Sequence, residues 1–394
     1  MRGPVLASGS MSWSAIAPAL ERAREDAVSA YALGARAAPR GARRLAIGDP
    51  QAPLPAFLAI LDSQGLLGDD GRLAPNVHLV SMGDHFDWGK REDRDSVARS
   101  GQALLAWLAA HPPEQVTLIL GNHDLGRVGE LADFDEVSFR AAQTEADAVA
   151  GGQGSAERFR ERHPQLPAPE LVSRDLSSFR PEQRRLVAEL LRARRFCTAL
   201  APSPRLLLSH AGVTREDLAA AGLSGNAPID AGAASQALNA ALDHAVASWQ
   251  DQTPLAIPAL HRPGEAARGE GRGIFYHRPS HPDAGGRDLF EGPPRRRFDP
   301  RWLPPSMVQA IGHIGDRKCR ELLRHWAPPV REATLGRLRH LRTNGRDVRY
   351  DVGVAEPRDS DEALLLFLDG TMARAEPRSY ELLDLDTLCP ASPC

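Results

Sequence analysis

Polar residues that can bind metals or transfer protons follow five short apolar runs in this sequence. Asp84 and Asp87 stand three residues apart after the run 77–82, and Gly83 before them allows a tight backbone turn. A lone Gly-Asp pair is a common turn signal. The other four runs end in Gly48-Asp49-Pro50-Gln51, Gly121-Asn122-His123-Asp124, Ser209-His210-Ala211-Gly212 and Gly312-His313. The recurrence, more than any one block, indicates a shared site.

This mixture of carboxylate, amide and imidazole groups suits two divalent first-row metal ions. Asp84 is the natural candidate for a carboxylate that bridges them. Two ions about 3.5–4 Å apart can hold both the attacking and the leaving oxygens of an in-line displacement. A water between them loses its proton near neutral pH, which supplies a hydroxide. The chemistry that these residues favour is therefore phosphate transfer to water.

Strands and helices are predicted to alternate around these residues. Strands are expected at 43–48, 77–82, 116–120, 205–209 and 307–311, with a closing pair at 346–354 and 363–368, and helices at 17–33, 54–64, 95–111, 180–196, 233–249 and 317–326. Thr214 is a plausible N-cap for a further helix. Alternation of this kind predicts a parallel sheet covered on both faces. Ligands of open α/β sheets bind beyond the carboxyl ends of the strands, where all five polar blocks lie.

The chain divides into an N-terminal helical extension at 1–40, a main domain at 41–375 and a C-terminal tail at 376–394. Within the domain, a helical insertion at about 125–200 either lies over the site or simply covers the sheet. A Pro- and Gly-rich stretch at about 251–305 is expected to be a long ordered loop. Met11 is a possible alternative start, so residues 1–10 need not be native.

The composition of the 394 residues excludes several classes of protein. A net charge of -3 argues against a nucleic-acid binder that acts by charge alone. Neither a membrane span nor a secretory signal is visible. The four scattered cysteines indicate reduced thiols rather than a zinc site or a disulfide framework, and we expect a cytoplasmic protein.

The order of the five blocks resembles the calcineurin-like metallophosphoesterase superfamily, from about residue 43 to 371. The Ser209-His210-Ala211-Gly212 block and Tyr350-Asp351-Val352-Gly353 are similar to the branch of phosphoprotein phosphatases and diadenosine tetraphosphatases. The resemblance implies a four-layer α/β/β/α sandwich of two mixed sheets flanked by helices. It also implies a hydrolase that uses two metal ions.

The resemblance further implies a role for each residue of the blocks. Asp49, Gln51 and Asp84 would hold one ion. Asp84, Asn122, His210 and His313 would hold the other. His123 would protonate the leaving oxygen, Asp87 would orient His123, and Asn122 and His123 would also contact the substrate.

Two departures from the family pattern bear on metal and substrate. Gln51 stands where many members have His, and its amide oxygen favours Mn²⁺ or Mg²⁺ over Zn²⁺, with Fe also possible. Trp88 stands where phosphoprotein phosphatases have a phosphate-binding Arg. Arg278, in a stretch similar to the Gly-x-x-Trp-x-Arg of bacterial members, is the first candidate to replace it. Lys90, Arg91, Arg268 and Arg272 are the alternatives.

Three substrate classes remain open: phosphoproteins, phosphomonoesters such as sugars or nucleotides, and dinucleoside polyphosphates. A phosphodiesterase of nucleic acids is disfavoured, since no basic stripe is visible. A rival of another class is a catalytically silent metal-binding protein. Gln51 and Trp88 favour that rival, whereas the complete set of the other polar residues opposes it.

Overall fold

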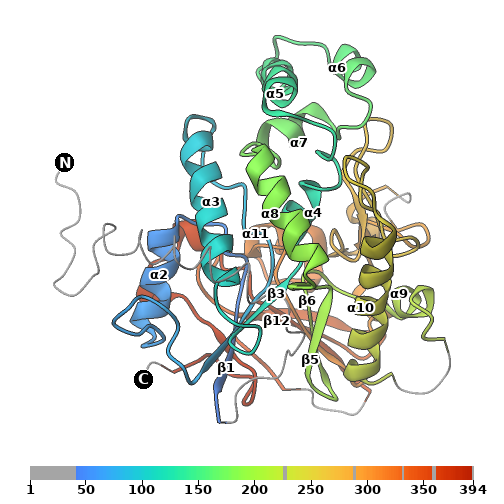
Figure 1. The fold of residues 1–394 in the computed structure, drawn as a ribbon. Coiled ribbons are helices and arrows are strands. Elements are labelled where there is room, and N and C mark those ends of the chain that lie inside the picture. Colours follow the sequence, from blue (N-terminus) through green and yellow to red (C-terminus); the bar gives the residue numbers. More distant parts are fainter. Residues whose placement is uncertain (1–40, 225–228, 287–289, 331, 357–360, 393–394) are drawn as a thin grey trace.

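A computed structural model describes residues 41–224, 229–286, 290–330, 332–356 and 361–392 of the chain (Figure 1). The predicted helix at 17–33 and the extension 1–40 lie outside the described residues, as does Cys394. Of the three cysteines within them, Cys197 and Cys319 are buried and Cys389 is exposed, and none of the three forms a disulfide. No helix among the described residues is long and apolar enough to cross a membrane.

The first of two large sheets has the strand order β15–β1–β2–β3–β4. Its strands are β1 (Arg43–Ile47), β2 (Val77–Ser81), β3 (Val116–Ile119), β4 (Phe196–Cys197) and β15 (Leu383–Asp384). β1 to β4 run parallel, and β15 pairs antiparallel with β1. The parallel strands therefore end at one common edge, where the loops after them begin.

The second sheet has the order β13–β12–β14–β11–β6–β5. Its strands are β5 (Ala199–Ser203), β6 (Leu206–Ser209), β11 (Val308–Ile311), β12 (Arg339–Thr343), β13 (Val348–Val352) and β14 (Ala363–Phe367). β6, β11 and β14 run parallel, while the other three strands pair antiparallel with their neighbours. Both sheets are mixed, as predicted.

The two sheets face each other across a shared apolar core. Because side chains alternate along a strand, Leu79 and Val80 of β2 point to opposite faces. Val80 packs with Leu208 of β6 and Ala310 of β11 between the sheets. Leu79 packs on the outer face instead, beneath the helices.

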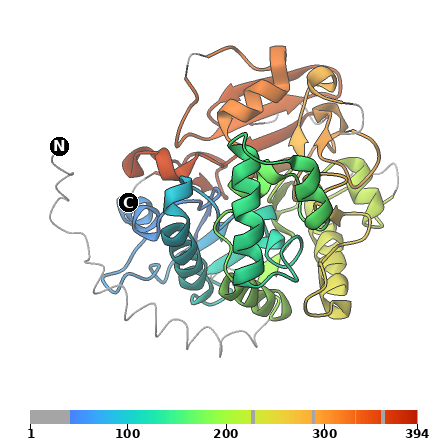
Figure 2. The same ribbon diagram turned by 90° about the horizontal axis from the view of Figure 1, so that it is seen from above.

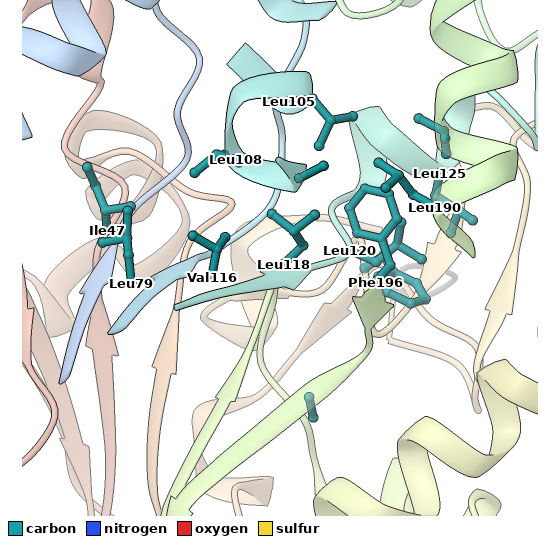
Figure 3. Close-up of a cluster of buried hydrophobic side chains, with 14 of the residues drawn as sticks. Ile47, Leu79, Leu105, Leu108, Val116, Leu118, Leu120, Leu125, Leu190 and Phe196 are labelled. Carbon is teal, nitrogen blue, oxygen red and sulfur yellow. The ribbon is translucent and has the colours of Figure 1, made fainter. Parts of the chain in front are cut away.

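Helices cover the outer face of each sheet. On the first sheet lie α2 (Leu54–Ser63), α3 (Arg94–Ala109) and α8 (Pro181–Arg192); on the second lie α10 (Ala231–Ser248) and α11 (Asp316–Leu323). Figure 3 shows Leu105 and Leu108 of α3 and Leu190 of α8 packed over the first sheet. This is the predicted four-layer α/β/β/α sandwich. Thr214 caps α9 (Arg215–Ala220) as predicted, by accepting a hydrogen bond from the Asp217 backbone.

The segment between β3 and β4 contains two different parts. After the short α4 (Asn122–Gly126), the helices α5 (Glu136–Ala150), α6 (Ala156–Arg162) and α7 (Pro169–Arg174) gather around their own apolar cluster, which includes Phe139, Phe159 and Phe179. Figure 1 shows them grouped beyond α3 and α8, and Figure 2 views them from that end. α8 belongs instead to the core over the first sheet. The helix α8 thus covers the first sheet, whereas α5, α6 and α7 form a separately packed helical group.

Three predicted features differ from the structure. The helix expected at 180–196 ends at Arg192, because Phe196 and Cys197 pair with β3 as the strand β4. The strands expected at 346–354 and 363–368 are not direct partners, since β12 lies between them. The sequence did not predict β12, because its arginines interrupt the apolar pattern expected of a buried strand. The expected tail contributes β15, an edge strand of the first sheet.

The described residues of the stretch 251–305 include two small ribbons. β7 (His261–Arg262) pairs with β8 (Arg272–Gly273), and β9 (Arg278–Pro279) pairs with β10 (Arg297–Phe298). The side chain of His277 contacts the carbonyl oxygen of Gly212, 2.9 Å from its Nδ1. That contact brings β9 beside the loop that carries His210.

Candidate active site

The polar blocks of both sheets meet at the carboxyl edge of their strands. Asp49, Asp84 and Asn122 follow β1, β2 and β3, while His210 and His313 follow the neighbouring strands β6 and β11. The two sheets touch here: the backbone N–H of His313 donates to Asp49 Oδ2 at 2.8 Å. A Cβ on Gly312 would stand 1.8 Å from Asp49 Oδ1, so only glycine allows this approach.

Four of the predicted metal ligands form one compact group. Ligand atoms of Asp84, His210 and His313 lie within 4.8 Å of one another. His210 Nε2 is 3.4 Å from Asp84 Oδ2 and 3.0 Å from Asn122 Oδ1. Two imidazoles, a carboxylate and an amide oxygen thus surround one point, which is a donor set that fits a divalent transition metal.

The two histidines present unused nitrogen lone pairs to this point. His210 Nδ1 lies 2.7 Å from the carbonyl oxygen of Met82, so Nδ1 carries the proton and Nε2 is the free base. His313 Nε2 is buried without a hydrogen-bond partner. Burial, together with the positive charge of Arg278, keeps the pKa of His313 well below its usual range. A metal ion would satisfy both nitrogens.

Asp49 and Gln51 lie beside this group in different ways. Asp49 Oδ1 is buried and has no hydrogen-bond partner. Burial raises the pKa of Asp49 well above its usual value, and the nearby carboxylates Asp369 and Asp84 raise it further. Carboxylates crowded in this way favour a cation. Gln51 donates from its amide nitrogen to the carbonyls of Phe86 and Asp87, at 2.9 and 3.1 Å, which leaves its oxygen to accept.

Three residues of the site have a left-handed backbone, which is unfavourable for residues with a Cβ. The φ angles are 59° at Asp84, 63° at Asp87 and 67° at His313. Such conformations cost about 1–3 kcal/mol each and cluster at functional sites.

His123 forms a pair with Asp87 next to the predicted metal ligands. His123 Nδ1 is 2.9 Å from Asp87 Oδ2, and its Nε2 is 3.8 Å from Asp84 Oδ2. Burial would lower the pKa of His123, but the charges of Asp84 and Asp87 outweigh it and raise the pKa to about 9. The geometry leaves Nε2 as the nitrogen that faces the site.

Two residues that the sequence did not suggest hold Asp87 in place. Arg127, which is fully buried, donates to Asp87 Oδ2 at 2.5 Å and to the carbonyl of His123 at 3.0 Å. Ser178 donates to Asp87 Oδ1 from its backbone N–H and its hydroxyl, at 2.9 and 2.7 Å. The i, i+4 spacing of His123 and Arg127 was a usable signal. No pattern in the sequence indicated Ser178, because it lies far from Asp87 in the chain, in the helical segment between β3 and β4.

Asp124 joins the two loops of the first sheet. Its carboxylate accepts backbone N–H bonds from Asp84 and Gly121, both at 3.0 Å, and from His85 at 3.1 Å. It is fully buried. Asp124 thus acts on the site by fixing the backbone that carries Asp84 and Asn122.

Arg278, the candidate phosphate ligand, is paired with Glu270. Its two terminal nitrogens donate to the two carboxylate oxygens, at 3.0 and 2.6 Å. The pair orients the guanidinium and leaves three of its five N–H donors for other partners. Among the alternatives, Lys90, Arg91 and Arg268 make ion pairs with Glu92, Asp147 and Glu265.

Comparison with known proteins identifies a similar family for part of the chain. Residues 42–218 match the family model of the calcineurin-like phosphoesterases. The match includes the blocks from Asp49 to His210, and β11 then brings His313 beside them. No curated protein matches the sequence.

Two solved structures are similar to this chain at low identity. One is a cold-active protein tyrosine phosphatase, with 14% identity and a TM-score of 0.39 over 90% of this chain and 77% of that chain. The other is a cold-active protein-tyrosine phosphatase of a psychrophile Shewanella species, with 15% identity and a TM-score of 0.28 over 56% of this chain and 53% of that chain. The family match over residues 42–218 and the geometry of the site together indicate a calcineurin-like phosphoesterase domain in this chain, which hydrolyses phosphate esters and contains a candidate metal site.

Proposed function

We propose that this enzyme is a phosphomonoesterase that uses two divalent metal ions. The observation that carries the proposal is the convergence of Asp84, Asn122, His210 and His313 directly beside the His123–Asp87 pair. Asp84, Asn122, His210 and His313 would hold one ion. Asp49, Gln51 and Asp84 would hold the other. When bound, the ions would neutralise the phosphate and supply hydroxide as the nucleophile at neutral pH.

The remaining roles belong to residues of the chain itself. Asp87 holds His123 by Nδ1, so Nε2 faces the site and donates a proton to the leaving oxygen. Arg127 and Ser178 keep Asp87 in its orientation. Asn122 and His123 lie next to the position of the phosphate, and the free N–H donors of Arg278 bind its oxygens.

We propose Mn²⁺ as the preferred ion. Gln51 contributes a neutral amide oxygen rather than an imidazole, and oxygen donors favour Mn²⁺ or Mg²⁺ over Zn²⁺. His210 and His313, at the other position, favour a first-row transition metal. Mn²⁺ satisfies both positions, whereas Mg²⁺ suits only the first. Iron remains the alternative to be tested.

The test combines elemental analysis with a substrate panel. We expect close to two divalent ions per chain and hydrolysis of p-nitrophenyl phosphate that is lost on chelation and restored best by Mn²⁺. Bis-p-nitrophenyl phosphate and a dinucleoside polyphosphate test the diester and polyphosphate alternatives. A protein that binds metal but hydrolyses nothing in the panel would be the silent binding protein instead.

A further inference from the structure

A cavity of about 320 Å³ lies in the loop 251–305, outside the metal centre. Arg262, Arg268 and Arg272 line it, together with Glu270, Glu291 and a group of prolines. Small-molecule sites in proteins have volumes of about 300–1,000 Å³, so the cavity has room for part of a small ligand.

The charges around this cavity are unbalanced. Arg262 and Arg272 are direct partners across the β7–β8 ribbon, where like charges oppose pairing. Within the described residues, neither side chain has an ion-pair partner, and Arg272 Nε is buried without a hydrogen bond. Glu270 is already bound through both oxygens to Arg278. Glu291 also lines the cavity and offsets one of these two positive charges, so an anion in the cavity would offset the other.

Glu270 connects the cavity to the metal centre. Its carboxylate lines the cavity and at the same time holds Arg278. The residue before Arg278, His277, contacts the loop after His210 through the carbonyl of Gly212. The Glu270–Arg278 pair therefore joins the lining of the cavity to the segment that contacts the loop after His210.

We propose that the cavity binds a second anionic group of the substrate. The substrate class would then be a small phosphomonoester that carries another phosphate or a carboxylate, with one anion at the metals and the other at Arg262 and Arg272. This inference rests on the proposed function for the first anion. The limited volume favours a small molecule over a phosphopeptide.

The test uses ligands whose P–C bonds the enzyme cannot cleave. Binding of α,ω-alkane bisphosphonates with three to eight carbons is compared with that of alkyl monophosphonates of the same length, by titration calorimetry on the metal-loaded wild-type protein. We expect one bisphosphonate length to bind at least about tenfold more tightly than its monophosphonate. Phosphonocarboxylates of that length distinguish a phosphate from a carboxylate as the second anion.

Variants then locate the second anion. Arg262→Gln and Arg272→Gln should each reduce the affinity ratio of bisphosphonate to monophosphonate by about tenfold. Arg346→Gln, on the exposed turn between β12 and β13, is the matched control and should leave the ratio unchanged.

Equal affinity for bisphosphonate and monophosphonate at every chain length would overturn the inference. A higher affinity for the bisphosphonate that persists in both Arg262→Gln and Arg272→Gln would overturn it as well. An Arg262-dependent preference for acidic phosphonopeptides alone would replace the small molecule with a peptide. Because binding is measured without turnover, failure of the phosphomonoesterase proposal is seen separately, as no hydrolysis of p-nitrophenyl phosphate.

Discussion

The two sheets contribute different halves of the site by different means. The first supplies Asp49, Asp84 and Asn122 from glycine-containing loops, and Asp124 ties the loops of Asp84 and Asn122 together by backbone hydrogen bonds. The second supplies His210 and His313, which are distant in sequence and meet because β6 and β11 pair in parallel. Local hydrogen bonds thus fix the backbone at Asp84 and Asn122, whereas strand pairing brings the two imidazoles together.

The largest effect is expected at Asp84, which lies between the two halves. Asp84→Asn should reduce the binding of both ions and lower turnover by more than the about 10²–10⁴-fold expected for loss of a general acid. His313→Ala should remove mainly one ion. Elemental analysis and p-nitrophenyl phosphate kinetics measure both effects, and full metal content in Asp84→Asn would contradict the bridging role.

His123 tests the catalytic pair without removing a metal ligand. His123→Ala should lower turnover of alkyl phosphates by about 10²–10⁴-fold with nearly unchanged metal content. The loss should be smaller for p-nitrophenyl phosphate, because its leaving group hardly needs a proton. An equal loss on alkyl and aryl substrates would argue against a role as general acid.

Arg278 tests the contribution of the loop 251–305. Arg278→Lys should raise KM and lower kcat/KM by about ten- to a hundredfold with unchanged metal content, since lysine cannot donate two parallel bonds to phosphate. Arg346→Lys is the control for loss of a guanidinium elsewhere. If Arg278→Lys behaves as wild type while Arg268→Lys or Arg91→Lys does not, the phosphate-binding role belongs to one of those arginines.

Ser178 tests whether the segment between β3 and β4 supports the catalytic pair. Ser178→Ala removes one hydrogen bond to Asp87 and keeps the other, from the backbone, so turnover of alkyl phosphates should fall by about tenfold. The loss should be smaller for aryl phosphates, a pattern that general destabilisation would not produce. Thr144→Ala on α5, with a hydroxyl that donates to the carbonyl of Arg140, is the control.

The smallest effect on activity is expected at His111, which lies away from the site. It is buried, and its ring nitrogens bond to the Trp107 carbonyl and the Leu73 N–H, so it must be neutral. Burial lowers its pKa from 6.5 to about 4 in the folded protein. The unfolded chain therefore binds more protons between these values, and this contribution to stability, complete above pH 6.5, is lost as the pH falls toward 4.

The loss at pH 4 amounts to about 3 kcal/mol for this one histidine. Urea unfolding of wild type and His111→Gln at pH 7.5 and 4.5 measures it. The variant should lose less stability than wild type over this range. An equal decrease in the free energy of unfolding of both proteins between pH 7.5 and 4.5 would show that His111 does not titrate in this way.

The sequence by itself determined the residue types and the strands that carry them. Asp84, Asn122 and His210 follow apolar runs short enough to be strands, and this local pattern predicts both the elements and the common edge. The left-handed backbone at Asp84 and His313 had no such signal, since residues with a Cβ rarely adopt it.

Tertiary structure alone decided which distant groups meet. Ser178 reaches Asp87 because the chain returns from a separately packed helical body, and Glu270 meets Arg278 within a loop that has no periodic pattern. The strand β12 was missed because Arg339 interrupts its apolar pattern. Arg339 is nevertheless buried, and it donates hydrogen bonds to the carbonyls of Ile314 and Asp369. A local pattern reports the balance of apolar and polar residues along one element, but these contacts depend on partners that only the folded chain supplies.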